Sequence, residues 1–241
     1  KGETKISNAA REPEIEDLSK CLIKMGAKIE GHGTKTILVQ GVTNLKKAEH
    51  EIIADRIVAG TYIIAALMLN SALEINNFNT IYLKSLIDIL KKMGAKLKVS
   101  KNSIKVFKGS KLKSSSLSTS PYPGFPTDLQ AQLMSLMCIS DGKSKIKETI
   151  FENRFMHVPE LNRLGANITV EKDTATIIGN QTFKGAQVMA SDLRASISLV
   201  LAAMNANGQT TLNRVYHLDR GYENIEKTLG SLGAKIKRQK N

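Results

Sequence analysis

A phrase of eight residues occurs four times in this chain of 241 residues, and it constrains the fold more than any other feature. Its Gly-Ala pair begins at Gly26, Gly94, Gly165 and Gly233, so neighbouring copies lie 68, 71 and 68 residues apart. Self-similarity at a fixed period is typical of chains that repeat one supersecondary unit. The four copies read LIKMGAKI at 22–29, LKKMGAKL at 90–97, LNRLGANI at 161–168 and LGSLGAKI at 229–236.

Each copy predicts an amphipathic helix that stops at the glycine and passes directly into a strand. Apolar residues ahead of the glycine recur at helical spacing, as in Leu83, Leu86 and Leu90. Glycine ends a helix well because it tolerates the left-handed backbone conformation that a helix cap requires. We therefore expect a helix-to-strand junction at each Gly-Ala pair.

A second element recurs between the phrases, at 55–69, 128–139 and 192–204. Each copy begins with an Asp that follows Ala, Thr or Ser, which is typical of a helix N-terminus. The residues that follow are apolar on nearly every face, so such a helix must be surrounded by protein. If the units are related by approximate threefold symmetry, the N-termini at Asp55, Asp128 and Asp192 lie at one end, which would attract phosphates and carboxylates.

Strands placed between these helices give a βαβαββ unit, in the order strand, buried helix, strand, amphipathic helix, strand, strand. The first full unit is expected at about 49–108 and the second at about 117–179. A third starts near Gln187 and includes a strand at 234–237, after which the closing strand is lacking. The sequence thus predicts an α/β protein with one buried helix per unit and sheets on the outside.

Residues 3–41 supply the last half of another unit. We expect a strand, a helix from Glu12 to Met25, and strands at 27–30 and 36–40 joined by a hairpin turn at Gly31-His-Gly33. The chain therefore holds about three and a half units. Because it begins Lys-Gly-Glu-Thr-Lys, we expect it to have been cut from a longer protein.

Composition excludes several classes of protein. The longest nearly uncharged stretch, 57–75, is interrupted by Gly60 and Glu74, so it cannot supply the ~20 apolar residues of a membrane span. The net charge of +13 is dispersed along the chain without interleaved aromatic residues, so nucleic acid is not an expected partner. Cys21 and Cys138 lie in apolar helical patterns, which predicts two reduced thiols in a cytoplasmic protein.

Five longer motifs resemble the UDP-N-acetylglucosamine 1-carboxyvinyltransferases, the MurA group of enolpyruvyl transferases. They occur in order across essentially the whole chain. The motifs are NAAREPEI at 8–15, PYPGFPTDLQAQ at 121–132, ETIFENRFMHVPEL at 148–161, DLRAS at 192–196 and DRGYE at 219–223.

This resemblance implies a fold and a reaction. Such enzymes have two domains of three units each, forming an inside-out α/β barrel with the substrates in the cleft between them. They transfer the enolpyruvyl group of phosphoenolpyruvate to the 3-hydroxyl of UDP-N-acetylglucosamine and release phosphate, the first committed step of peptidoglycan synthesis. The resemblance implies no organic cofactor.

The resemblance also implies that this chain is a C-terminal portion. Residues 1–53 would be the tail of the first domain, and residues 54–241 most of the second, with one strand supplied by the absent N-terminal part. The mobile loop with the reactive cysteine would be absent too, since Cys21 and Cys138 lie inside helical phrases. We therefore expect the chain by itself to be inactive.

The resemblance assigns roles to five residues of this sequence. Asp128 would orient or deprotonate the attacking hydroxyl, while Arg194 and Arg220 would contact the group derived from phosphoenolpyruvate. Arginine suits that task because its planar fork grips carboxylate and phosphate with two hydrogen bonds. Ile150 would contact the nucleotide sugar through its backbone, and Arg154 would bind substrate or brace the site.

Plainer structural interpretations stay open for the same residues. Asp128 could simply cap its helix, and Arg194 and Arg220 could pair with the neighbouring Asp192 and Asp219. Glu152 could brace the site together with Arg154. Capping and ion pairing are the preferred interpretation for the residues facing the expected hinge, which are Glu12, Glu14, Asp55 and Arg56.

The four histidines give no sign of a metal site. His157 is expected to be packed at the start of a helix, and none of the others, His32, His50 and His217, has ligand spacing to an acid or a cysteine.

Two other functions remain as alternatives. One is a basic module that binds an anionic ligand or nucleic acid without catalysis, and the other is a relative of 3-phosphoshikimate 1-carboxyvinyltransferase.

Overall fold

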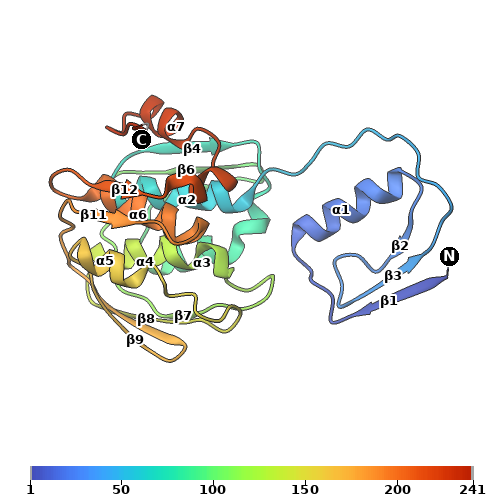
Figure 1. The fold of residues 1–241 in the computed structure, drawn as a ribbon, viewed down its shortest axis with the longest axis horizontal. Coiled ribbons are helices and arrows are strands. Elements are labelled where there is room, and N and C mark those ends of the chain that lie inside the picture. Colours follow the sequence, from blue (N-terminus) through green and yellow to red (C-terminus); the bar gives the residue numbers. More distant parts are fainter. Residues whose placement is uncertain (1, 240–241) are drawn as a thin grey trace.

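The computed structural model describes residues 2–239 and begins with a small sheet and one helix (Figure 1). Helix α1 follows the first strand, and the three strands form an antiparallel sheet in the order β1-β3-β2. The turn between β2 and β3 contains Gly31 and Gly33, both with positive φ, which confirms the predicted hairpin. The elements are β1 (Glu3–Ser7), α1 (Pro13–Lys24), β2 (Lys28–Glu30) and β3 (Thr36–Gln40).

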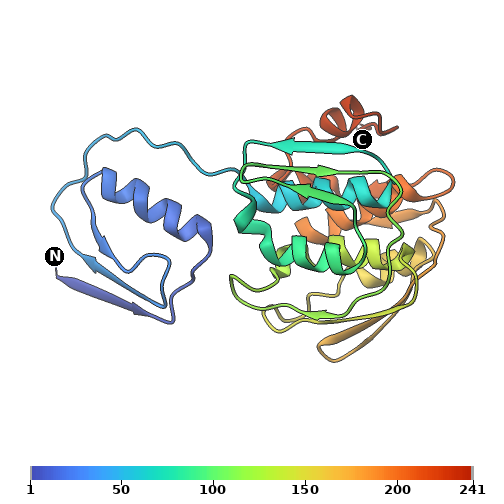
Figure 2. The same cartoon turned by 180° about the vertical axis from the view of Figure 1, so that it is seen from behind.

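Residues 41–55 form neither helix nor strand and lead from this N-terminal part to the larger body (Figure 2). The strand expected near the start of the first full unit is therefore absent, and Ile52 in this stretch is 78% exposed. In the two later units the leading strand pairs in parallel with the next strand along the chain. Strand β4 (Leu73–Asn76) pairs within the described residues with β6 alone, so its other edge is unpaired and residues 41–55 do not join it.

The first full unit otherwise has the predicted order. Its sheet is antiparallel with the closing strand β6 in the middle, in the order β4-β6-β5. After α2 and β4 come α3, β5 and β6, the helix being preceded by a 3-10 turn at Thr80–Leu83. Their bounds are α2 (Arg56–Met68), α3 (Lys84–Lys92), β5 (Leu97–Val99) and β6 (Ser103–Val106).

The second unit is complete, and its sheet has the order β7-β8-β10-β9. Again the closing strand, β10, lies between the second and third strands of the unit. Strand β7 pairs with β8 in parallel, and the other pairs are antiparallel. The elements are β7 (Leu117–Ser118), α4 (Gln130–Ile139), β8 (Lys143–Lys147), α5 (Val158–Arg163), β9 (Asn167–Glu171) and β10 (Thr174–Ile178).

The third unit contains only a two-stranded parallel sheet, β11-β12. The strand predicted at 234–237 is not formed. In the other two units the corresponding strand pairs with a central closing strand, and no such strand follows α7 among residues 2–239 to accept its hydrogen bonds. The elements are β11 (Gln187–Met189), α6 (Leu193–Asn205), β12 (Thr211–Asn213), a 3-10 helix η3 (Val215–Arg220) and α7 (Ile225–Ser231).

The four repeated glycines all end a helix in the predicted way. Gly26, Gly94, Gly165 and Gly233 have φ values of +103°, +97°, +100° and +99°. In each copy the N–H of the following alanine donates to the carbonyl of the leucine that begins the phrase, as from Ala95 to Leu90 at 2.9 Å. This bond satisfies a carbonyl that the end of a helix leaves free, so the repeat encodes one capping motif four times.

Helices α2, α4 and α6 form the interior, and the sheets lie outside them (Figure 1). The predicted buried helices and external sheets are therefore confirmed. The helices also meet through polar groups, since the Ser135 hydroxyl donates to the Ser198 carbonyl at 3.1 Å and Gln132 donates to Thr61 at 3.2 Å. Within residues 2–239, no helix is long and apolar enough to span a bilayer.

Candidate active site

Asp128 does not cap its helix, although the sequence suggested that it could. Residues 127–129 form a 3-10 turn ahead of α4, and the residue before that turn is Pro126. Asp55 and Asp192 do act as caps, because each carboxylate accepts two backbone N–H groups of its own helix. The 3-10 turn therefore leaves the carboxylate of Asp128 available for other partners.

Two arginines from different parts of the chain bind the two oxygens of Asp128. Arg154 Nη2 lies 2.7 Å from Oδ1, and Arg194 Nη2 lies 2.9 Å from Oδ2. Arg154 comes from the loop between β8 and α5, and Arg194 from the first turn of α6. The arginine side chains are only 12% and 18% exposed, whereas that of Asp128 is 42% exposed, so the cluster has one open side.

The two arginines also decide the protonation of Asp128. Partial burial by itself would raise the pKa of the carboxyl, but the hydrogen bonds and positive charges of Arg194 and Arg154 outweigh it and lower the pKa below the usual range. Burial would lower the pKa of Arg194, and Asp128 more than compensates. The cluster is therefore an ionised carboxylate between two cations with a net charge of +1, which suits an anionic ligand.

Arg194 does not use its side chain to pair with Asp192. The Asp192 carboxylate instead accepts the backbone N–H of Arg194 at 2.8 Å and that of Ala195 at 3.0 Å. These bonds start α6 and leave the guanidinium free to reach Asp128, 66 positions earlier in the chain.

Arg220 forms no hydrogen bond with the cluster of Asp128, Arg154 and Arg194. It is the exposed last residue of η3, and its side chain makes no hydrogen bond or ion pair among residues 2–239. The suggested pair with Asp219 is wrong, since Asp219 binds Arg238 with a bond of 2.8 Å and a second ion-pair contact. Arg220 is consequently free to bind an anion.

Ile150 has already used its backbone N–H, which donates to the Glu148 carboxylate at 2.9 Å. Its carbonyl is the backbone group left for a ligand, and its side chain is 44% exposed. Glu152 is exposed and makes no hydrogen bond or ion pair within the described residues, so it does not brace the site.

Glu148 is a residue that the sequence analysis did not single out. It is only 6% exposed and accepts four hydrogen bonds from the two loops that carry Asp128 and Arg154. Strand alternation could have revealed it, because Ser144 and Ile146 are the buried residues of β8 and position 148 continues that face.

The residues near the expected hinge form ion pairs between the N-terminal part and the larger body. Arg56, at the start of α2, binds Glu14 of α1 with distances of 2.9 and 3.3 Å and lies 5.7 Å from the ring centre of Tyr122. Asp17 of α1 also lies 3.0 Å from Nε2 of His50, which belongs to the connecting residues 41–55. The preferred interpretation, capping and ion pairing, is confirmed for Asp55, Arg56 and Glu14. It is wrong for Glu12, whose side chain makes no capping hydrogen bond to α1 and no ion pair within the described residues.

Both cysteines lie in helices, and His157 is a buried residue directly before α5. Cys138 is buried, which raises the pKa of its thiol to about 12, and Cys21 is half-buried. Neither forms a disulfide. His157 is 1% exposed, as expected for a packed histidine. Within the described part of the chain, no group of three potential ligand side chains gathers around a common metal position.

Comparison with known proteins gives consistent results. A profile of the family described as EPSP synthase (3-phosphoshikimate 1-carboxyvinyltransferase) matches residues 1–229. A UDP-N-acetylglucosamine 1-carboxyvinyltransferase of Pelagibacter ubique is 52% identical over 238 residues, which cover 99% of this chain and 57% of that protein. One from Azorhizobium caulinodans is 54% identical over 239 residues, 99% of this chain and 56% of that protein.

Solved structures share the fold. The enolpyruvyl transferase NikO from Streptomyces tendae superposes with a TM-score of 0.90 at 29% identity, over 99% of this chain and 57% of that one. EPSP synthase from Acinetobacter baumannii superposes with a TM-score of 0.76 at 18% identity, over 100% of this chain and 58% of that one. The chain thus spans somewhat more than half the length of these proteins. Because the family profile covers residues 1–229, the chain belongs to the EPSP synthase family of enolpyruvyl transferases.

Proposed function

We propose that this chain provides one wall of the active site of a UDP-N-acetylglucosamine 1-carboxyvinyltransferase. The observation that carries the proposal is the ionised Asp128 held between Arg154 and Arg194. It occurs in a chain 52% and 54% identical to two enzymes of that name. The reaction would move the enolpyruvyl group of phosphoenolpyruvate to the 3-hydroxyl of the sugar and serve peptidoglycan synthesis in the cytoplasm.

The geometry of the cluster suits this chemistry. The sugar oxygen forms a bond to the central carbon of phosphoenolpyruvate, the bond from that carbon to phosphate oxygen breaks, and the hydroxyl proton must leave. Asp128 can accept a hydrogen bond from that hydroxyl through its open side and orient the oxygen for attack. The lowered pKa of Asp128 makes its carboxylate a weak base. It accepts the hydroxyl proton only as the new carbon–oxygen bond draws electron density from the sugar oxygen and makes that proton more acidic.

Binding of the anionic substrate would change this balance. Arg194 and Arg154 are the countercharges available for a carboxylate or phosphate at this point. A hydrogen bond that an arginine gives to the ligand is one that Asp128 loses, and the pKa of Asp128 rises as a result. The base would thus become stronger when phosphoenolpyruvate is bound. Exposed Arg220 is proposed as a further contact to that group, and the carbonyl of Ile150 as a contact to the nucleotide sugar.

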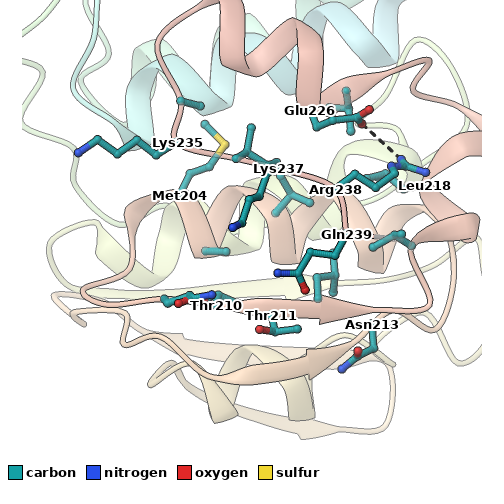
Figure 3. Close-up of a pocket in the computed structure, with 18 of the residues that line it drawn as sticks. Met204, Thr210, Thr211, Asn213, Leu218, Glu226, Lys235, Lys237, Arg238 and Gln239 are labelled. Carbon is teal, nitrogen blue, oxygen red and sulfur yellow. Dashed lines mark ion pairs between the residues drawn. The ribbon is translucent and has the colours of Figure 1, made fainter. Parts of the chain in front are cut away.

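The division into domains is part of the proposal. Residues 1–53 would belong to the first domain and residues 54–241 to the second, whose third sheet is completed by a strand from the part of the protein outside this chain. In support, a groove of about 930 Å³ lies between β12 and the segment 234–239 (Figure 3). The closing strands β6 and β10 occupy the corresponding place in the first two units. Catalysis is accordingly proposed for the longer protein, and we expect no turnover from the 241 residues alone.

Phosphate release tests the function directly. The longer protein should release phosphate from phosphoenolpyruvate only when UDP-N-acetylglucosamine is present, and Asp128→Asn should lower kcat by about a hundredfold or more. Full turnover by Asp128→Asn would remove the role given to this carboxylate. Release that depends on shikimate 3-phosphate would instead favour the related synthase, and no release with either acceptor would favour an anion-binding module.

A further inference from the structure

We propose that Glu148 is a positioning residue that fixes Asp128 and Arg154 relative to each other. The inference rests on the proposed function for its catalytic consequence. Its structural basis is independent of that function and consists of the hydrogen bonds around one buried carboxylate.

Glu148 holds two loops through its two oxygens. Oε2 accepts from the Thr127 hydroxyl at 2.9 Å, and Thr127 directly precedes Asp128. Oε1 accepts from the backbone N–H groups of Ile150 at 2.9 Å and Phe151 at 3.2 Å, at the start of the loop that carries Arg154. One side chain thus binds both loops whose tips form the contact between Asp128 and Arg154.

The arrangement leaves Glu148 little freedom. Oε1 also accepts from the Thr119 hydroxyl at 2.7 Å, so the carboxylate receives four hydrogen bonds, three at Oε1 and one at Oε2. Thr119 in turn binds Thr149 through two further bonds of 2.6 and 2.9 Å. A buried acceptor with all its partners in place is rigid, and removing it would leave several donors without a partner.

The two loops also meet directly beyond Glu148. Within its own loop, the guanidinium of Arg154 lies 5.0 Å from the ring centre of Phe151, whose N–H is bound by Glu148. Arg154 Nη2 additionally lies 3.5 Å from the Thr127 carbonyl. A shift of either loop would therefore be transmitted to the 2.7 Å contact between Arg154 and Asp128.

The alternative is that Glu148 only stabilises the fold. Both roles predict a less stable variant, so stability cannot distinguish them. The pKa of Asp128 can distinguish the two roles, because it depends on how closely Arg154 and Arg194 approach the carboxylate.

The test uses Glu148→Ala, with Glu148→Gln as the conservative variant and Glu171→Gln as the matched control. Glu171 is an exposed carboxylate on β9 of the same sheet, without a hydrogen bond or ion pair among residues 2–239. The pKa of Asp128 is measured in the 241-residue chain from the ¹³C shift of its side-chain carboxyl group. We expect a rise of about one pH unit in Glu148→Ala, recovery towards wild type in Glu148→Gln and no change in Glu171→Gln.

The same variants in the longer protein connect this measurement to catalysis. The acid limb of the pH profile of kcat/KM should move to higher pH in Glu148→Ala by the same amount, and kcat should fall about tenfold or more. If Glu148→Ala does not fold, Thr127→Val removes the single bond at Oε2 and should raise the pKa of Asp128 in the same direction.

The outcomes separate the two proposals. An unchanged pKa of Asp128 in a folded Glu148→Ala or Thr127→Val variant overturns the positioning role, whatever the enzyme does. A wild-type longer protein that releases no phosphate overturns the proposed function, while the shift of Asp128 still decides the role of Glu148.

Discussion

The buried His157 should make this protein sensitive to acid, by an amount that follows from its surroundings. The side chain is 1% exposed, and Nε2 contacts the sulfur of Met134 at 3.3 Å. Burial is the main cause that lowers the pKa of His157 from 6.5 to about 4. The charge of Asp192 and the backbone hydrogen bond to Arg154 oppose the shift, and the charge of Arg154 adds to it. The imidazole is consequently neutral in the folded protein at pH 7.

The sign of the effect follows from proton linkage. Between pH 6.5 and pH 4 the unfolded chain binds a proton at His157 that the folded protein does not, so stability falls as the pH falls. A pKa difference of this size corresponds to a loss of about 2 kcal/mol by pH 5 and about 3 kcal/mol by pH 4. About one unit above pH 6.5 the contribution is nearly complete, because His157 is then mostly neutral in both states.

Urea denaturation of wild type and His157→Gln at several values of pH measures this loss. Glutamine does not titrate in this range, while every other ionisable group is shared by both proteins. The difference in unfolding free energy between wild type and variant should therefore shrink by about 2 kcal/mol from pH 8 to pH 5. A difference that stays constant over that range would show that His157 is not held neutral by its burial.

Three further substitutions test the packing, the caps and the link between the two parts. Leu86→Ala removes a fully buried side chain between α3 and α2 and should cost about 2–5 kcal/mol in urea denaturation, whereas a cost under 1 kcal/mol would contradict a close-packed interior. Asp55→Ala removes the two bonds that begin α2 and should cost about 0.5–2 kcal/mol, with Asp55→Asn, which can still cap, as its control. Arg56→Ala removes the pair with Glu14, so limited proteolysis within residues 41–55 should become faster, and an unchanged cleavage rate would show that this pair does not restrain the N-terminal part.

The features that could be predicted from sequence depend on neighbours along the chain. A glycine four positions after a leucine, with apolar residues at helical spacing before it, is enough to specify a helix, its cap and the turn into the next segment. The continuously apolar helices could likewise be assigned to the interior, because no exposed helix can carry that composition in water. The family motifs add the identity of the candidate residues to this local pattern.

The errors of prediction concern pairing between distant segments. Strands were expected near residue 50 and at 234–237, where the local pattern is suitable, yet neither is formed within the described residues. A strand exists only where it pairs with a neighbouring strand, and the sequence of one segment does not show whether that pairing forms. The segment 234–237 has no closing strand beside it among the described residues, whereas residues 41–55 leave the open edge of β4 unpaired.

The helix caps depend on residues close together in the sequence, whereas the candidate site depends on contacts between distant segments. The sequence by itself determined the repeat, the capped helices and the buried interior, since these follow from chemistry within a few residues of each position. Only the tertiary structure decided that Asp128 leaves its helix uncapped and takes Arg154 and Arg194, and that Glu148 joins the two loops beneath them. The sequence around a carboxylate offers several possible partners. The packing of the units decides which charged group comes within about 3 Å and binds it.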